Sequence, residues 1–206
     1  MTDALERRTE AGPLAPATAE QGPPEDVPMT VLEHLGELRS RLIKSLLGTF
    51  PAIMIAWEFK EKLLDFLLRP FSVAYRRLGL GDKAVMNYSN PPEMFTTYMK
   101  ISIVCGFMIA SPWVFYQVWA FIAPGLYKKE RLYAIPFVLA STLFFSGGAF
   151  FAYGALMPQM YETLLGMGGQ IEGSSLLIQP MMLITENMAF ATQVLLAFGV
   201  VFEVPV

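Results

Sequence analysis

The sequence has very few residues that could catalyse a reaction or hold a metal. Its 206 residues include one cysteine, Cys105, and one histidine, His34. A single cysteine excludes a disulfide within the chain, and one Cys with one His cannot build a metal site. There is no G-x-S-x-G element, and no long apolar run contains paired carboxylates, as intramembrane proteases require. The sequence therefore predicts a protein that is not an enzyme and needs no cofactor or metal.

Basic residues are missing from the carboxyl-terminal part of the chain. All 15 Lys and Arg residues lie at or before Arg131, and the net charge is −3. They form no block with interleaved aromatic residues, which excludes nucleic acid as a partner. Charged residues make up 16% of the chain and apolar residues 54%, against about 25% and about 45–50% in soluble proteins. This composition favours a protein surrounded by lipid.

The first 28 residues lack the continuous apolar stretch that a cleaved signal peptide needs. They contain six acidic residues and five prolines, with Arg7 and Arg8 among them. Such a segment cannot bury enough apolar surface to offset the entropy lost on ordering. We expect residues 1–28 to form a disordered cytoplasmic tail.

Four segments are predicted to cross the membrane, over about 38–57, 99–123, 133–158 and 184–206. There are 27 uncharged residues between Lys100 and Lys128 and 30 between Arg131 and Glu162, whereas about 20 apolar residues suffice. The first span is weaker, because only 13 uncharged residues follow Lys44 before the next acid. It requires basic side chains to extend their charges to the interface. The fourth span has 16 uncharged residues before Glu203, and the sequence ends inside it.

Orientation follows from the basic residues in the short flanks of the spans. Arg39, Arg41 and Lys44 flank the first span, and three more basic residues join the second to the third. Both flanks, and with them the amino terminus, are predicted to be cytoplasmic. Segment 58–98 should then be exported, although it is rich in basic residues, with an amphipathic helix around KEKLLDFLLRPF.

Prolines interrupt the predicted spans. Pro112, Pro136 and Pro158 fall within or at the ends of spans two and three, where proline kinks a helix. Gly147 and Gly148 make part of span three narrow and favour close helix packing. The predicted fold is an all-α polytopic membrane protein whose kinked helices form a concave surface.

Three acids near or inside these spans are candidate site residues. Glu203 lies deep in the fourth span, where burying an acid costs about 2.5–3.5 kcal/mol. It either serves a function or reaches interfacial water at the end of the helix. Glu37 and Glu130 lie at the predicted cytoplasmic ends of spans one and two. Taken alone they read as surface charges, because Glu37 can pair with Arg41 at i,i+4 spacing and Glu130 has basic neighbours.

Two long motifs resemble those of the TatC family, the receptor subunit of the twin-arginine translocase. EHLGELRSRL (33–42), which contains His34 and Arg39, resembles the HLxELRxRL signature. ASPWVFYQVWAFIAPGLYKKER (110–131), which begins around Pro112, resembles the most recognisable block of the family. Shorter matches are PPEMFTTYMK, the LRPF around Pro70, and FGVVFEVPV at the end. The resemblance covers about residues 29–206, so this part is expected to form one TatC-like membrane domain.

The resemblance implies a concave wall of six helices in a bacterial inner membrane, of which this chain is expected to hold four. It implies Sec-independent export of folded proteins, in an oligomeric complex with the single-span proteins TatA and TatB. By motif position, Glu37 and Glu130 correspond to the acids that receive the two arginines of a signal peptide. Phe121 and Pro124 belong to the same recognition surface, and Glu203 corresponds to an intramembrane acid that faces TatA or TatB.

Two other functions are compatible with the residues themselves. An ion-coupled transporter could use Glu203 as a proton-binding carboxylate, because an acid at that depth is unusual. A structural membrane subunit without a binding site of its own would explain the spans but no site.

Overall fold

The computed structural model describes residues 31–81, 84–122, 134–170, 177–178 and 181–205. The predicted tail, 1–28, lies outside the described residues, as do Pro124 and Glu130. Within the described ranges the chain forms six α-helices in the order α1 to α6 and one short antiparallel pair of strands. Their bounds are α1 Val31–Glu58, α2 Lys60–Arg77, α3 Pro91–Ile122, α4 Ala134–Phe151, η4 Ala152–Leu156, α5 Met157–Gly166, β1 Gly169–Gln170, β2 Leu177–Ile178 and α6 Ile184–Glu203.

Three helical segments in the described part of the chain are long and apolar enough to cross a membrane. They are Pro91–Ile122, the continuous rod Ile135–Gly166 and Ile184–Glu203. A fourth span is possible if the bent pair Glu33–Glu58 and Lys60–Arg77, which turns by 79°, is counted as one. The all-α polytopic fold predicted from the sequence is confirmed, whereas the first predicted span, in α1, is not apolar enough to qualify without α2.

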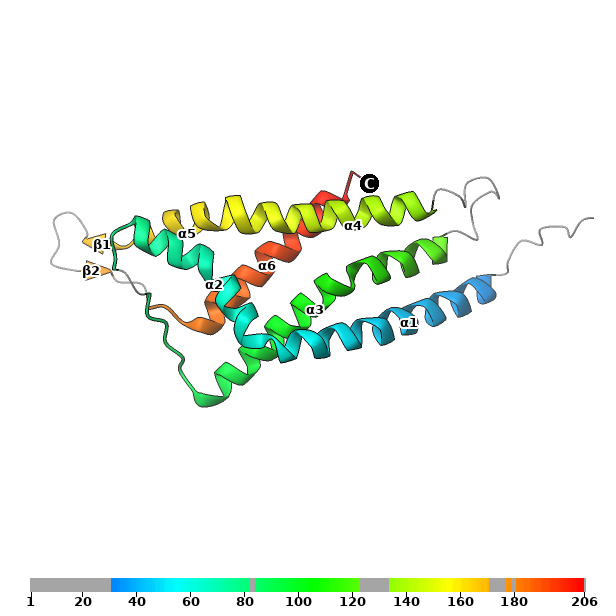
Figure 1. Ribbon diagram of the computed structural model, residues 1–206, viewed down its shortest axis with the longest axis horizontal. Helices are drawn as coiled ribbons and strands as arrows, with labels where there is room; N and C mark the ends of the chain where they lie inside the picture. Colours follow the sequence, from blue (N-terminus) through cyan, green and yellow to red (C-terminus); the bar gives the residue numbers. More distant parts are fainter. Residues whose placement is uncertain (1–30, 82–83, 123–133, 171–176, 179–180, 206) are drawn as a thin grey trace, which may run out of the picture.

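The helices form two sides, and one helix crosses between them. Figure 1 shows α1 and α3 side by side, α4 and α5 along the opposite side, and α6 crossing obliquely between them. The start of α6 is joined to the start of α3 by the Thr97 and Thr185 hydroxyls, 2.9 Å apart. We call the end where α1 begins and α3 ends the amino-terminal end, and the opposite end the α2 end.

Glycines allow α1 and α3 to pack closely. A Cβ at Gly106 of α3 would lie 2.6 Å from the Cα of Ile53, and one at Gly48 of α1 would overlap the indole of Trp113. The indole N–H of Trp113 donates a hydrogen bond to the carbonyl of Lys44, at 3.0 Å. Small residues at such positions let two helix backbones approach each other inside a membrane. This contact fixes the position of α1, whose own apolar stretch is short.

The predicted close packing of span three is formed by one of its two adjacent glycines. A Cβ at Gly148 would lie 2.5 Å from the carbonyl oxygen of Phe198 on α6, whereas nothing lies within 4 Å of one at Gly147. Successive residues of a helix point about 100° apart, so only one of the pair can face α6. The α4–α6 contact therefore rests on Gly148.

Proline changes the third span at the position that the sequence indicated. Between α4 and α5 the helix widens into the π-helical turn η4, where the N–H of Met157 bonds to the carbonyl of Ala152. Pro158 follows directly and has no N–H to offer to the preceding turn. Pro136 instead lies in the first turn of α4, where the N–H groups have no partner within the helix.

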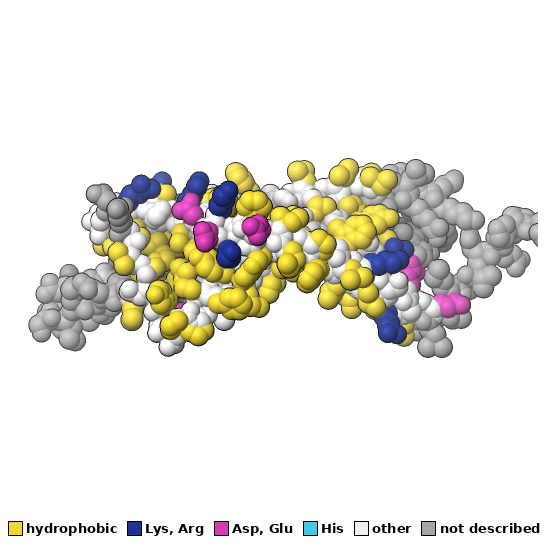
Figure 2. Space-filling view, turned by 60° about the horizontal axis from the view of Figure 1, so that its bottom comes forward, with side chains coloured by type: hydrophobic (Ala, Val, Ile, Leu, Met, Phe, Trp, Pro, Cys, Tyr) yellow, Lys and Arg dark blue, Asp and Glu magenta, His cyan; other side chains and the backbone are white. Residues whose placement is uncertain are grey.

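Segment 58–98 contains the amphipathic helix that its sequence predicted. In α2, the side chains of Leu67, Pro70, Phe71 and Ala74 are buried, at the spacing of one helix face. Figure 2 shows two groups of charged side chains with a broad hydrophobic surface between them. This arrangement is what a protein with an apolar belt in the bilayer and charged surfaces at both interfaces presents.

The main hydrophobic core lies at the α2 end. Leu67 and Phe71 of α2 pack with Ile101 of α3, Tyr161 of α5 and Met188 of α6. The Phe71 and Tyr161 rings meet edge to face with centroids 5.3 Å apart, and the hydroxyl of Tyr161 donates to the Asn187 side chain. The core fixes the α2 end, while the first part of α1 and the last part of α3 project from it as a pair (Figure 1).

Candidate functional site

Glu37 lies on α1 near the amino-terminal end, with only 20% of its side chain exposed. Its Oε1 accepts a hydrogen bond from the guanidinium of Arg41 at 3.2 Å, one helical turn further along. This is the i,i+4 pair expected from the sequence. The second oxygen, Oε2, is buried and has no hydrogen-bond partner among the described residues. A buried carboxylate oxygen in this state is an acceptor ready for a cationic donor.

A residue of α3 holds Arg41 in place. Gln117 is only 2% exposed, and its Oε1 lies 3.5 Å from the second terminal nitrogen of Arg41. One guanidinium thus bridges a carboxylate of α1 and an amide of α3, which suits its planar fork of donors. The bridge fixes the orientation of the Glu37 carboxylate and leaves Oε2 unpaired.

An aromatic contact lies beside this polar group. The imidazole of His34 stacks on the ring of Phe121, with centroids 4.4 Å apart and planes inclined by 19°. The paired ends of α1 and α3 thus hold four of the sequence-predicted residues, His34, Arg39, Glu37 and Phe121. The side chain of Arg39 is exposed. The structure brings one acid and one aromatic ring of the predicted recognition surface together. Its other two members, Pro124 and Glu130, lie outside the described residues.

Glu203 is the last residue of α6 and lies far from the ends of the third span. The preceding residue, Phe202, meets Gly148 of α4. Gly148 lies 14 residues after the start of α4 at Ala134, or about 20 Å along a helix. The Oε2 of Glu203 is buried without a hydrogen-bond partner in the described part of the chain. Among the described residues, the end of α6 at Glu203 therefore lies level with the middle of the rod Ile135–Gly166, and not beside either of its ends.

Two of the other predicted residues have structural surroundings. Pro70 lies on the buried face of α2, and Pro112 lies inside α3 with its ring exposed. Pro70 packs on the face of α2 that contacts the core. Pro112 directly precedes Trp113, which makes the α1–α3 contact. Neither residue lies at the polar group around Glu37.

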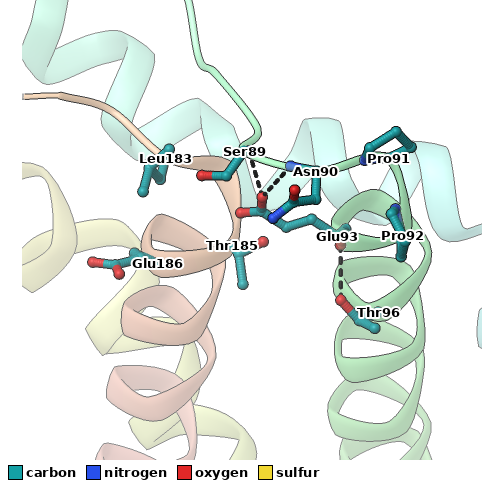
Figure 3. Close-up of a pocket in the computed structure, with 9 residues that line it drawn as sticks. All are labelled: Ser89, Asn90, Pro91, Pro92, Glu93, Thr96, Leu183, Thr185 and Glu186. Atoms are coloured by element: carbon teal, nitrogen blue, oxygen red, sulfur yellow. Dashed lines mark hydrogen bonds between the residues drawn. The ribbon is translucent and has the colours of Figure 1, made fainter.

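A polar cavity of about 660 Å³ opens at the α2 end, between the starts of α3 and α6. Figure 3 shows Glu93 turned toward the backbone of Ser89 and Asn90, and Glu186 pointing away from it. The Glu93 carboxylate accepts both backbone N–H groups, at 2.5 and 3.2 Å. This is the capping box of α3, with glutamate at the third helical position bonding back to the helix start. The Glu93 carboxylate therefore serves to cap α3, and the second acid of the lining, Glu186, points away from it (Figure 3).

Sequence reasoning missed Gln117 and the unpaired state of Glu37. Gln117 stands within the second motif, and its polarity inside a long apolar run is the signal that could have identified it. A buried amide requires a hydrogen-bond partner. Which partner it has depends on the register between α1 and α3, and this register is a tertiary property.

The fold and these positions define a polytopic α-helical membrane protein with one polar group at the paired ends of α1 and α3 and one partly buried acid at the end of α6. The family model described as Sec-independent protein translocase protein (TatC) matches residues 33–206. The chain belongs to the TatC family.

Similar proteins agree with this assignment. The chain is 41% identical to the Sec-independent protein translocase protein TatC of Desulforapulum autotrophicum over 84% of this chain and 60% of that protein. It is 39% identical to the protein of the same name from Koribacter versatilis, over 86% and 62%. A crystal structure of the twin-arginine translocase receptor TatC superposes with a TM-score of 0.70 at 35% identity, covering 84% of this chain and 71% of that one. The chain thus spans about 60% of the length of the first two relatives.

Proposed function

We propose that this chain acts in Sec-independent protein export as a receptor for twin-arginine signal peptides. The observation that supports it best is the Glu37 carboxylate, which is oriented by Arg41 and has one buried oxygen without a partner among the described residues. Such an oxygen accepts a donor from an arginine side chain more readily than a solvated surface acid, because its desolvation has already taken place. The role is one of binding, without covalent chemistry.

The neighbouring surface suits the rest of a signal peptide. The stacked pair of His34 and Phe121 is an apolar, aromatic platform beside Glu37. Leu35 and Leu38 on the same helix are 54% and 43% exposed. The apolar part of a signal peptide can bury this surface, at about 25 cal/mol for each Å² removed from water. Glu130, by its place in the second motif, is proposed to receive the second arginine.

Glu203 is proposed as the contact for the single-span partners TatA and TatB. Its Oε2 is buried and has no hydrogen-bond partner in the described part of the chain, and this supports the proposal, because a polar side chain from a second helix would satisfy it. The relatives are named as protein translocases, and they give no support to the alternative of an ion-coupled transporter.

The location that goes with this function is a bacterial inner membrane with the amino terminus in the cytoplasm. Arg39, Arg41 and Lys44 gather at the amino-terminal end, as the positive-inside rule requires of a cytoplasmic flank. The basic residues of α2 lie at the other end, on a helix that packs over the core. The proposed orientation in the membrane is therefore based on the basic residues in the short flanks of the spans, and not on those of α2.

The test is recovery of a tagged precursor. The complete protein is purified from membranes with a precursor that has the twin-arginine motif, and in parallel with a version in which both arginines are lysines. Preferential recovery of the twin-arginine precursor is expected, because lysine cannot place two parallel donors on one carboxylate. Equal recovery of the two precursors would remove the basis for the receptor function.

A further inference from the structure

An apolar cavity lies between α2, α3 and α4, away from both sites described above. Its volume is about 260 Å³, and its lining includes Leu63 and Phe66 of α2, Cys105 of α3, and Phe145 and Ser146 of α4. Of the 12 lining residues only Ser146 and Tyr153 have a polar oxygen. The hydroxyl of Tyr153 already donates to the carbonyl of Phe66, at 2.8 Å. The cavity therefore suits an occupant made of hydrocarbon.

The mouth of this cavity faces the apolar surface of the helices. Three of its lining residues, Phe66, Ile109 and Phe150, are 43%, 57% and 77% exposed. Ile109 and Phe150 lie well inside two of the candidate spans. An opening at this position meets the acyl chains of the bilayer and not water.

A second, polar cavity lies one turn further along α2. It has a volume of about 440 Å³ and is lined by Arg69, Arg76, Asp65 and Ser72, with apolar residues at its base. Asp65 pairs with Arg69 at 3.3 Å, whereas Arg76, among the described residues, donates from its Nε to the carbonyl of Ser72 at 3.4 Å. The cavity thus keeps an excess of positive charge with donors available to an anion.

The two cavities have no lining residue in common and approach each other at the Phe66–Arg69 turn of α2. The rings of Phe66 and Tyr153 stack with centroids 4.2 Å apart and planes inclined by 8°, and both residues line the apolar cavity. Phe66 and Arg69 are three residues apart on α2, which is about 4.5 Å of helix. One amphiphilic molecule can therefore reach both cavities.

We propose that α2 and the adjacent faces of α3 and α4 form a binding site for an anionic glycerophospholipid. One acyl chain occupies the apolar cavity, and the phosphate lies against Arg69 and Arg76. Charge complementarity favours this occupant over a protein helix, since a guanidinium matches a phosphate bidentately and an apolar helix brings no anion. The lipid would bridge α2 to the third span, alongside the stacked rings.

Native mass spectrometry tests the headgroup contact. The full chain, purified in mild detergent, is exposed to equal amounts of phosphatidylglycerol and phosphatidylcholine. We expect preferential retention of phosphatidylglycerol, reduced at least threefold when Arg69→Gln and Arg76→Gln are combined. The matched control is Arg77→Gln on the same helix, since Arg77 is paired with Glu162 at 2.7 Å and should leave retention unchanged. Equal retention of both lipids, or equal losses in the double variant and the control, would overturn the proposal.

Photocrosslinking in membranes tests the acyl-chain contact. Phosphatidylglycerol with a diazirine in its acyl chain is incorporated into vesicles that contain the full chain. Labelling is expected in peptides that contain Cys105 or Ser146, and Ser146→Phe, which fills the mouth, should reduce it at least threefold. Leu139→Phe, at an exposed position of α4, serves as the control, and the melting temperature of each variant shows that it is folded. Labelling confined to other peptides, or unchanged by Ser146→Phe in a folded protein, would refute the site, including the case where a protein helix covers it.

Discussion

Replacing Glu37 by glutamine keeps the size of the side chain and removes its negative charge. In the structure this carboxylate already makes one charge-assisted contact to Arg41 and has a second oxygen without a partner. An incoming arginine would use that oxygen. Hydrogen bonds to charged groups contribute about 1.5–3 kcal/mol, and the upper range applies to sites protected from water. At 1.4 kcal/mol per tenfold change, Glu37→Gln should weaken binding of a twin-arginine peptide about 10- to 150-fold.

The exposure of the pair decides which range applies. Fully exposed ion pairs contribute about 0.2–1 kcal/mol, which would give a change of less than about sixfold. The Glu37 side chain is 20% exposed and that of Arg41 is 27% exposed. Both are thus largely shielded, and Gln117 holds the arginine from the other helix. The larger effect is therefore expected.

Fluorescence anisotropy of a dye-labelled peptide, with the protein in lipid nanodiscs, measures this change. Glu58→Gln makes the same substitution at the far end of the same helix and should leave the dissociation constant unchanged. A twin-lysine peptide completes a double-mutant cycle, and the preference for arginine over lysine should shrink in Glu37→Gln. A dissociation constant within twofold of the unmodified protein, in a variant with an unchanged melting temperature, would refute the reasoning.

Three further outcomes are expected. Gly106→Ala should lower stability by about 1–3 kcal/mol in thermal unfolding in detergent, because the new Cβ would lie 2.6 Å from the backbone of α1. Its control, Gly147→Ala, meets open space and should be neutral or stabilising. Glu203→Gln should raise the melting temperature of the isolated chain, because it removes a buried carboxylate whose Oε2 has no partner among the described residues, and a lower melting temperature would contradict this reason. The same variant should reduce recovery of a tagged TatA- or TatB-type protein. A double-mutant cycle of Arg77→Gln and Glu162→Gln, measured by unfolding, should give a coupling free energy between the two side chains of about 0.2–1 kcal/mol. A larger value would show that this ion pair between α2 and α5 is better shielded from water than its exposure indicates.

The spans and the amphipathic helix could be predicted from the sequence because they depend on local composition. A run of 27 or 30 uncharged residues has to be buried in lipid whatever its neighbours are. The apolar positions of α2 repeat with the helical period, so that a buried face at Leu67, Phe71 and Ala74 follows from the sequence alone. The family also followed, because its motifs are contiguous stretches of sequence.

The site could be predicted only in part. Sequence motifs indicated Glu37, Phe121 and Glu203, but by local rules Glu37 was a surface acid paired with Arg41. The pairing is present, and what changes its meaning is Gln117, 76 residues away from Arg41 on another helix. Local rules cannot detect this contact because it depends on how α1 and α3 pack.

The sequence by itself thus determined which segments are helices, which of them are apolar enough to span a membrane, and which family the chain belongs to. Each of these depends on residues close together in the chain. The tertiary structure decided which of two adjacent glycines faces α6 and that the end of α6 lies level with the middle of the rod Ile135–Gly166. It also decided that Glu37 has one buried oxygen without a partner in the described part of the chain. These depend on the register and crossing of helices, which are set by the packing of side chains that are distant in the sequence.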